Sequence, residues 1–354
     1  MLTSEELAAL RSRILACRNS AELPSGEDLI SLLNRVLTVY KEEDASYRPS
    51  ARSGEPGGLL DFRDGLVLPV VIVPDLHARP DFLIRLLACK LKGLDVLNAL
   101  NEGRLIVVCV GDGVHTELPG ADYERWLASY NAWREGEIDC PSMREEIRLG
   151  LATMMPVMEL KCAFPAHFHF LKGNHENVMN IEGMGDHSFR KYVMEGEMVK
   201  DFMQEVYGAS VLQLVRSFET SLPIVAVFDR FCVSHAEPAC GFSRDEIINY
   251  HDRDLRDEVV LSFTWTPNGG AEEGSVAGNF AALTGGQEAD ALWFGGHRPV
   301  EGPYALRQDG HYVQIHNPHE MNIVYISADR PFDLEKDIIP LVRDIHKKVE
   351  APQG

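Results

Sequence analysis

The fold class follows from the segment Leu66-Val67-Leu68-Pro69-Val70-Val71-Ile72-Val73-Pro74-Asp75-Leu76-His77. Its apolar run, 66–73, is nearly continuous, which is typical of a strand buried on both faces. Asp75 and His77 follow immediately beyond the strand end. Because a loop at that position can fold two side chains around one ion, we expect both residues to bind a metal.

Four further segments repeat this arrangement of an apolar run followed by polar, potentially metal-binding side chains. They are Gly111-Asp112 after 105–110, Gly173-Asn174-His175-Glu176 after 168–171, Ser234-His235 after 224–228 and 231–233, and Gly295-Gly296-His297 after 291–294. In α/β folds the sheet is rigid and the loops at strand ends carry the chemistry. The five segments therefore predict one shared site.

The residue types in these segments predict a site for two divalent metal ions. Two cations held close together need oxygen and imidazole ligands and one carboxylate that bridges them. Asp112 is the expected bridge, Asn174 offers an uncharged carbonyl oxygen, and His235 and His297 offer imidazole nitrogen to the second ion. Mixed oxygen and nitrogen donors suit Mn, Fe or Zn, and we expect Mn in a reducing cytosol.

Read in order with their neighbours, the five segments resemble the calcineurin-like metallophosphoesterases, most closely the phosphoprotein phosphatase branch. The matching segments are Asp75-Leu76-His77, Gly111-Asp112-Gly113-Val114, Gly173-Asn174-His175-Glu176, Ser234-His235-Ala236-Glu237-Pro238 and Gly295-Gly296-His297-Arg298-Pro299. The resemblance covers roughly residues 66 to 328. It implies an α/β fold of two mixed β-sheets packed face to face and flanked by helices, and it implies the metal ligands Asp75, His77, Asp112, Asn174, His235 and His297.

The chain departs from the family after the bridging aspartate. The family has Gly-Asp-x-Val-Asp-Arg-Gly, in which the second Asp orients the catalytic histidine and the Arg clamps phosphate, whereas this chain has His115-Thr116-Glu117. A neutral histidine cannot replace a carboxylate, and threonine lacks the bidentate fork of arginine. We expect His115 either to accept a hydrogen bond from His175 or to donate one to the substrate.

Other residues are expected to bind the substrate phosphate in place of that arginine. Arg79 lies two residues after His77 and Arg298 lies next to His297, so both are candidates, together with Asn174. His316 and His319 follow a strand beyond the last ligand, where the family has a substrate-flanking loop, and are candidates to reach the site.

The activity predicted from these residues is metal-dependent hydrolysis of a phosphate ester. Hydroxide bridging the two ions would attack phosphorus, and His175 would protonate the leaving oxygen as a general acid. The missing Asp-Arg pair favours a phosphomonoesterase acting on nucleotides or small molecules. The alternatives are a Ser/Thr protein phosphatase, a phosphodiesterase, and a scaffold that binds metal without catalysis.

The composition of the chain restricts the kinds of partner that we expect it to bind. The chain of 354 residues is 45% hydrophobic, long enough for a sizeable core, and holds no apolar segment of membrane-span length. It has 34 basic and 54 acidic residues and a formal net charge of -20, which argues against binding a nucleic-acid backbone. Its seven cysteines form no Cys-x-x-Cys pair, so we expect reduced thiols in a cytoplasmic protein with a phosphorylated substrate and no membrane partner.

The predicted organisation is one catalytic domain with helical additions. Residues 1–58 are expected to form an N-terminal helical extension and loop, 59–330 the catalytic domain, and 331–354 a C-terminal helix. Helical insertions are expected near 118–162 and 178–222, with helices over 123–135 and 188–218. These insertions either cap the site and select the substrate or pack on the outer faces.

Overall fold

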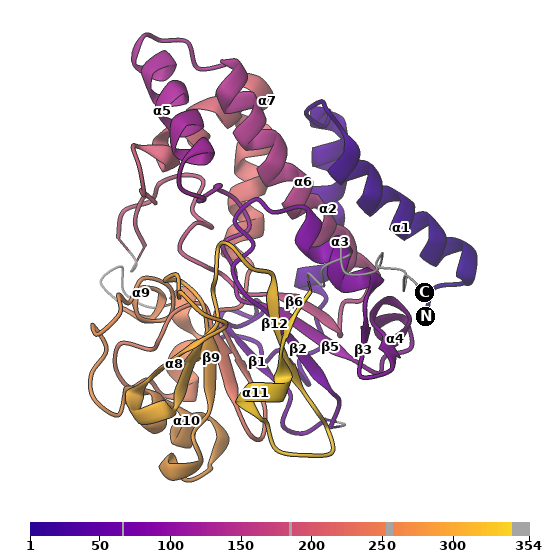
Figure 1. The fold of residues 1–354 in the computed structure, drawn as a ribbon, viewed down its shortest axis with the longest axis vertical. Helices are drawn as coiled ribbons and strands as arrows, with labels where there is room; N and C mark the ends of the chain where they lie inside the picture. Colours follow the sequence, from indigo (N-terminus) through magenta and orange to yellow (C-terminus); the bar gives the residue numbers. More distant parts are fainter. Residues whose placement is uncertain (66, 184–185, 253–257, 342–354) are drawn as a thin grey trace, which may run out of the picture.

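Two mixed β-sheets form the centre of the molecule (Figure 1), as the sequence predicts. The computed structural model describes residues 1–65, 67–183, 186–252 and 258–341. The first sheet has the strand order β1 (Leu59–Asp61), β7 (Val225–Val227), β8 (Cys232–Ser234), β9 (Trp293–Gly295), β11 (Tyr312–Gln314) and β10 (Ala305–Arg307). The second has the order β13 (Ile338–Pro340), β12 (Asn322–Ile326), β2 (Val70–Val73), β5 (Ile106–Cys109) and β6 (Phe168–Phe170). A separate hairpin pairs β3 (Lys90–Leu91) with β4 (Leu94–Asp95).

The central strands are buried on both faces. In β2, Val70 and Ile72 pack into the core between the sheets, while Val71 and Val73 pack against helices. In β7, Ala226 packs into the same core between the sheets, while Val225 and Val227 pack against the helices on the outer face of the first sheet. Alternate residues therefore enter different apolar layers, which explains why the strand sequences are continuously apolar.

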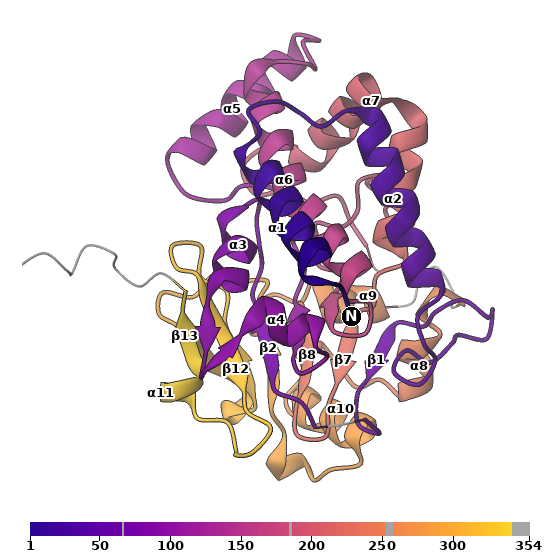
Figure 2. The same cartoon turned by 90° about the vertical axis from the view of Figure 1, so that its right-hand side faces the viewer.

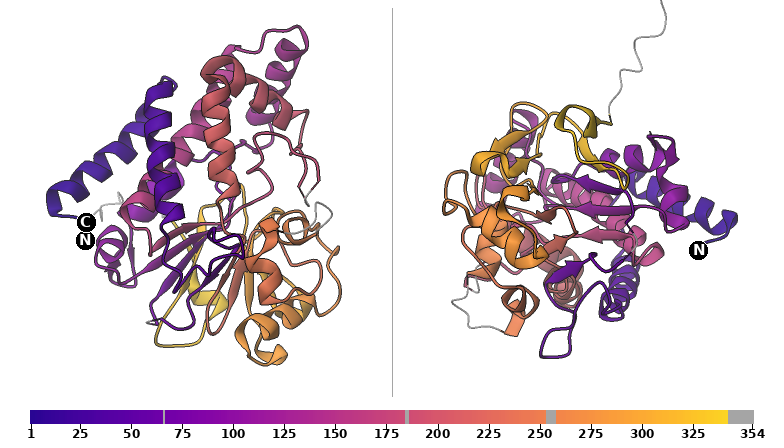
Figure 3. Two further views of the ribbon diagram at one scale, coloured as in Figure 1. Left: turned by 180° about the vertical axis from the view of Figure 1, so that it is seen from behind. Right: turned by 90° about the horizontal axis from the view of Figure 1, so that it is seen from below.

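Helices cover the outer face of each sheet. Those that share a core with the second sheet are α1 (Ser4–Asn19), α2 (Gly26–Lys41), α3 (Asp81–Ala88), α4 (Val96–Asn101), α6 (Pro141–Ala163) and α7 (Glu195–Thr220). Those that cover the first sheet are α8 (Arg244–Ile248), α9 (Val259–Thr264) and α10 (Ser275–Thr284), with the short 3-10 turns η1 (Tyr250–Asp252), η2 (Glu288–Asp290) and η3 (Gln308–Gly310) along the same half of the chain. Figure 2 shows α1 across α6, and the left view of Figure 3 shows α2 beside α7. Within the described ranges, no helix combines the length and apolarity needed to cross a membrane.

The two insertions are largely helical, as expected, and rise above one end of the sheets (Figure 1). The first consists of α5 (Ala121–Arg134) and α6, and α5 packs on both α6 and α7. In the second, the helix predicted over 188–218 begins only at Glu195, and Gly208 with φ 80° interrupts it. Residues 188–194 are not helical, and they contact the site described below.

The predicted C-terminal helix over 331–354 is wrong for its first part. Only Leu334–Asp337 forms a short helix, α11, and Ile338–Pro340 forms β13, which pairs antiparallel with β12. Ile338 and Ile339 pair with Val324 and Ile323 of β12 at the edge of the second sheet. The local sequence does not reveal this contact between distant segments. Residues 342–354 of that prediction lie outside the described residues.

Candidate metal centre

The predicted site residues converge at the carboxyl ends of six strands. In the second sheet β2, β5 and β6 are parallel neighbours, and in the first sheet β8, β9 and β11 are parallel neighbours. Parallel neighbours end at one edge of a sheet, so the loops that follow them meet there. Every one of the six predicted metal ligands lies on such a loop and is buried.

Asp112 lies between two sets of ligands. Its Oδ1 accepts a hydrogen bond from the backbone N–H of His175 at 3.0 Å. Its Oδ2 lies 3.6 Å from Nε2 of His77 on one side and 3.5 Å from Nε2 of His235 on the other. One carboxylate oxygen between two imidazole groups is the arrangement that a bridging ligand requires.

The set on the His235 side consists of Asp112, Asn174, His235 and His297. Oδ1 of Asn174 lies 2.9 Å from Nε2 of His235 and 3.0 Å from Nδ1 of His297. Nδ1 of His235 lies 3.1 Å from the carbonyl oxygen of Val110, and because a carbonyl only accepts, this nitrogen carries the ring proton. Nε2 therefore presents a lone pair to Asn174 and Asp112.

The set on the His77 side contains Asp75, His77 and Asp112. Nδ1 of His77 donates to the carbonyl oxygen of His115 at 3.0 Å, so Nε2 again presents a lone pair. That nitrogen lies 3.8 Å from Oδ2 of Asp75. Oδ2 of Asp75 also accepts from the backbone N–H of His297 at 2.9 Å, and Oδ1 has no hydrogen-bond partner among the described atoms.

This donor set fits two divalent cations. Burial lowers the pKa of His235 to about 4 and holds the pKa values of His77 and His297 well below the usual value, so these rings are neutral near pH 7. Burial, together with Glu176 and Asp75, raises the pKa of Asp112 well above its usual range. Neutral imidazole nitrogens and a buried carboxyl whose ionised form lacks a neighbouring positive charge are groups that a bound cation would stabilise.

Glu176 holds the ligand loops together, a role that the sequence pattern alone does not assign. Its carboxylate accepts hydrogen bonds from the backbone N–H groups of Asp112 at 3.0 Å, Gly113 at 2.9 Å and Gly173 at 2.7 Å. The loop after β5 is thereby tied to the loop after β6. Its place directly after His175 in the matched segment is the signal that could have revealed it.

The glycines of the motifs allow the backbone to approach the metal-binding carboxylates. A Cβ on Gly296 would lie 1.8 Å from Oδ1 of Asp75, and one on Gly173 would lie 2.2 Å from Oδ1 of Asp112. Both distances are far below van der Waals contact. These positions are glycine because a side chain there would displace a ligand.

We therefore expect Gly296→Ala to weaken metal binding and to lower turnover by about 10²-fold, because a displacement of about 1 Å at a reacting centre has an effect of that size. Metal content after dialysis and kcat/KM would be measured together. Gly278→Ala in α10, where a Cβ meets no atom within 4 Å, is the matched control and should behave as the wild type. Unchanged metal content in Gly296→Ala would contradict the assignment of Asp75.

His175 and His115 lie side by side without a hydrogen bond. Their ring centroids are 4.8 Å apart, and both nitrogens of His115 and Nδ1 of His175 lack hydrogen-bond partners among the described atoms. His115 packs between Trp126 and Phe189, and its nearest carboxylate oxygen, from Glu195, lies 3.5 Å from its Nε2. The expected hydrogen bond between the two histidines is therefore not formed. Ring nitrogens of His77, His115 and His175 lie within 4.8 Å of one another, and donation from His115 to a substrate stays a prediction.

His175 lies at the edge of the metal centre. Its Nε2 lies 3.6 Å from Oδ2 of Asp112, and its ring stacks on Phe189 of the second insertion at 4.5 Å. Burial, followed by the neighbouring His115 and His77, lowers the pKa of His175 well below the usual value. The ring is thus held at the edge of the metal centre in one orientation.

Arg79 does not face the centre, in contrast to the prediction that it binds phosphate. Its guanidinium donates to backbone carbonyl oxygens of five residues, namely Asp75, Leu76, Asn317, Pro318 and Glu320. It thereby fixes the loop after β2 to the loop after β11. These contacts occupy the donors that a phosphate would need, so the role of Arg79 is structural.

Arg298 and Thr116 are the two other positions considered for a contact with phosphate, and their surroundings differ. Arg298 is exposed beside His297, and its contact with phosphate stays a prediction. Thr116, which stands where the family has arginine, donates to Glu146 at 2.8 Å. Arg125 of α5 reaches Thr116 at 3.0 Å but pairs with Asp122 and Glu146.

The second insertion contacts the metal loops through residues that the sequence pattern does not single out. Lys191 Nζ lies 2.6 Å from Oε2 of Glu117, and the Tyr192 hydroxyl donates to the carbonyl oxygen of Glu117 at 2.5 Å. Phe189 and Glu195 contact His175 and His115 as described above. Residues 188–195 therefore lie against the site, while α6 and most of α7 pack on the outer face of the second sheet.

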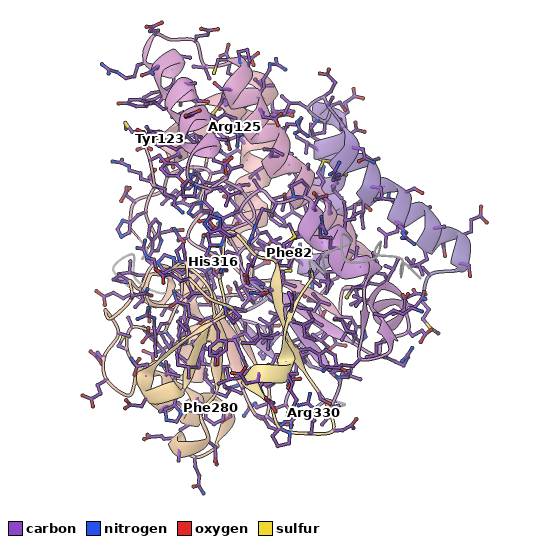
Figure 4. All side chains as sticks on the ribbon, in the orientation of Figure 1. Phe82, Tyr123, Arg125, Phe280, His316 and Arg330 are labelled. Atoms are coloured by element: carbon purple, nitrogen blue, oxygen red, sulfur yellow. The ribbon has the colours of Figure 1, made fainter. Side chains whose placement is uncertain are left out.

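Of the two further histidines considered, one reaches the centre. His316 is fully buried, and its Nδ1 lies 3.8 Å from Oδ2 of Asp75. His319 is exposed and donates only its backbone N–H, to Asn317 at 2.8 Å. Figure 4 shows His316 where the strands meet the helices of the insertions.

No protein-family model and no curated protein matches the chain. Among solved structures, it is similar to a protein serine/threonine phosphatase from Saccharomyces cerevisiae with similarity to human phosphatase PP5, at 14% identity and a TM-score of 0.53, covering 96% of this chain and 95% of that one. A cold-active protein-tyrosine phosphatase of the psychrophile Shewanella sp. matches at 15% identity over 76% of this chain and 77% of its own, with a TM-score of 0.42 that is too low to establish a shared fold. The chain therefore shares its overall fold with the yeast phosphatase, and its two mixed sheets flanked by helices are the fold that the resemblance of its motifs implied.

Proposed function

We propose that this protein is a phosphomonoesterase that depends on two divalent metal ions. The observation that carries the proposal is the position of Asp112 Oδ2, 3.6 Å from His77 Nε2 and 3.5 Å from His235 Nε2. The ions would supply an activated water and would neutralise charge on the phosphoryl oxygens. We favour Mn, since the ligands are oxygen and imidazole nitrogen without thiolate.

The side chains divide the remaining work. Asp75 and His77 would hold one ion, Asn174, His235 and His297 the other, and Asp112 both. His175 would donate the proton that the leaving oxygen needs, since it lies at the edge of the centre with its ring fixed by Phe189. Arg298, exposed beside His297, would contact the substrate phosphate.

For the substrate, we favour a phosphoserine or phosphothreonine residue in a protein over the nucleotide or small molecule that the sequence suggests. The support is the similarity to the yeast serine/threonine phosphatase along nearly the whole chain. A small phosphate ester is the second candidate. It is favoured by the burial of the ligands and by Thr116, which replaces the family's phosphate-clamping arginine.

A direct comparison of substrates distinguishes these two candidates. The Mn-loaded protein would be assayed with phosphoserine and phosphothreonine peptides, with nucleoside monophosphates and with a small aryl phosphate. We expect the highest kcat/KM for the peptides. A nucleotide or other small ester that exceeds every peptide would establish the second candidate instead, and a preference for diesters would refute both.

A further inference from the structure

Nδ1 of His316 is a buried imidazole nitrogen that lies beside the metal centre and has no hydrogen-bond partner among the described atoms. The residue follows β11, and its side chain is fully buried. Its Nδ1 lies 3.8 Å from Oδ2 of Asp75, the same distance that separates this oxygen from Nε2 of His77. No described atom forms a hydrogen bond with Nδ1 of His316, although a buried polar atom is normally paired.

The spacing of these atoms fits ligands of one ion. Donors that each bind a metal at about 2.0–2.2 Å lie about 3 to 4 Å from one another. Asp75, His77 and His316 together place their ligand atoms within 4.8 Å of one another. The rings of His77 and His316 have centroids 5.1 Å apart, so both converge on the same space.

Glu117 fixes the orientation of His316. Its Oε1 lies 2.6 Å from Nε2 of His316, and because an ionised carboxylate only accepts, Nε2 carries the ring proton and Nδ1 keeps the lone pair. Histidine ligands of metals commonly donate their second nitrogen to a carboxylate in this way. Lys191 holds the other oxygen of Glu117 at 2.6 Å.

We propose that His316 is a seventh protein ligand, which binds through Nδ1 the ion held by Asp75 and His77. Glu117 is the positioning residue that sets its tautomer, and Lys191 connects this pair to the second insertion. The ion then has four protein ligands, Asp75, His77, Asp112 and His316. This inference concerns the metal centre on which the proposed function rests, and it adds a ligand outside the five segments that predicted the site.

One consequence is a limit on how a phosphate can bind. A fourth protein ligand removes one open position from the ion near His77, while the ion near His235 already has four. Substrate oxygens must then approach from the side of the centre that no protein ligand occupies.

Metal affinity tests the ligand without relying on activity. The full chain, loaded with Mn²⁺, would be titrated with a competing chelator, and the bound metal counted at each step. We expect His316→Ala to lose one ion first and to bind it more weakly by more than about 100-fold, and Glu117→Gln to weaken it by about 10-fold to 100-fold. His319→Ala, an exposed histidine three residues along the same loop, is the matched control and should titrate as the wild type.

An affinity in His316→Ala equal to that of the wild type for both ions would overturn the proposal. If that variant does not fold, a crystal structure of the Mn-loaded wild type decides. A metal ion at about 2.0–2.3 Å from Nδ1 of His316 supports the proposal, and one farther than about 3 Å refutes it. Wild-type protein that holds two ions, one on His316, but hydrolyses no phosphate ester would refute the proposed function and leave this ligand in place.

Discussion

Asp112→Asn is expected to reduce the metal content of the purified protein from two ions per chain to at most one and to bring turnover close to background. The amide cannot supply the negative charge that one oxygen shares between two cations. In this structure the bridging position falls to Oδ2 of Asp112, because Oδ1 already accepts a hydrogen bond from the backbone N–H of His175. Elemental analysis and phosphate release would be measured on the same preparation.

Two further variants test whether the effect of Asp112→Asn comes from its bridging carboxylate. Asn174→Ala removes a neutral ligand near His235 and His297 and should weaken one ion selectively. Asp139→Asn removes an exposed carboxylate paired with Arg144 and should change neither metal content nor turnover. If Asp112→Asn retains two ions and normal turnover, Asp112 is not part of the centre.

His175→Ala is expected to keep both ions and to lower turnover by about 10² to 10⁴ for substrates with poor leaving groups, the range attributed to general acid catalysis. Esters with activated aryl leaving groups need less protonation and should be affected less. The readout is kcat for a peptide or alkyl phosphate against kcat for an activated aryl phosphate, with metal content determined in parallel.

His187→Ala is the control for this substitution, since His187 is half-exposed and pairs with Glu182. An equal loss for both leaving-group types would show that His175 positions phosphate or metal, and the assignment as general acid would be wrong. Loss of metal in His175→Ala would lead to the same conclusion.

The sequence predicts the sheets and the ligand loops well because both depend on local patterns. Continuous apolar runs such as 105–110 correspond to strands buried on both faces, and the residues directly after them reach the strand ends whatever the rest of the chain does. The local sequence around Asp75, Asp112 and His297 is therefore enough to assign them to one site. The capping box between Thr3 and Glu6 at the start of α1 is a local pattern of the same kind.

The parts that the sequence does not predict depend on contacts between distant segments. Arg79 is expected at the phosphate from its place near His77, but carbonyl groups of the loop after β11 occupy its guanidinium. The pairing of Glu117 with His316 spans 199 residues, and that of Glu117 with Lys191 spans 74. Likewise, β13 forms only because the edge of β12 is available to it.

Phosphate release by the purified chain is expected to depend on bound metal. Protein stripped with a chelator, reloaded with Mn²⁺ and freed of excess metal would be assayed with a phosphoserine peptide and a small aryl phosphate while bound metal is counted. We expect two ions per chain, turnover that disappears with the chelator, and recovery when metal is returned. Phosphate release that persists in the stripped protein, or a chain that binds no more than one ion, would contradict this expectation.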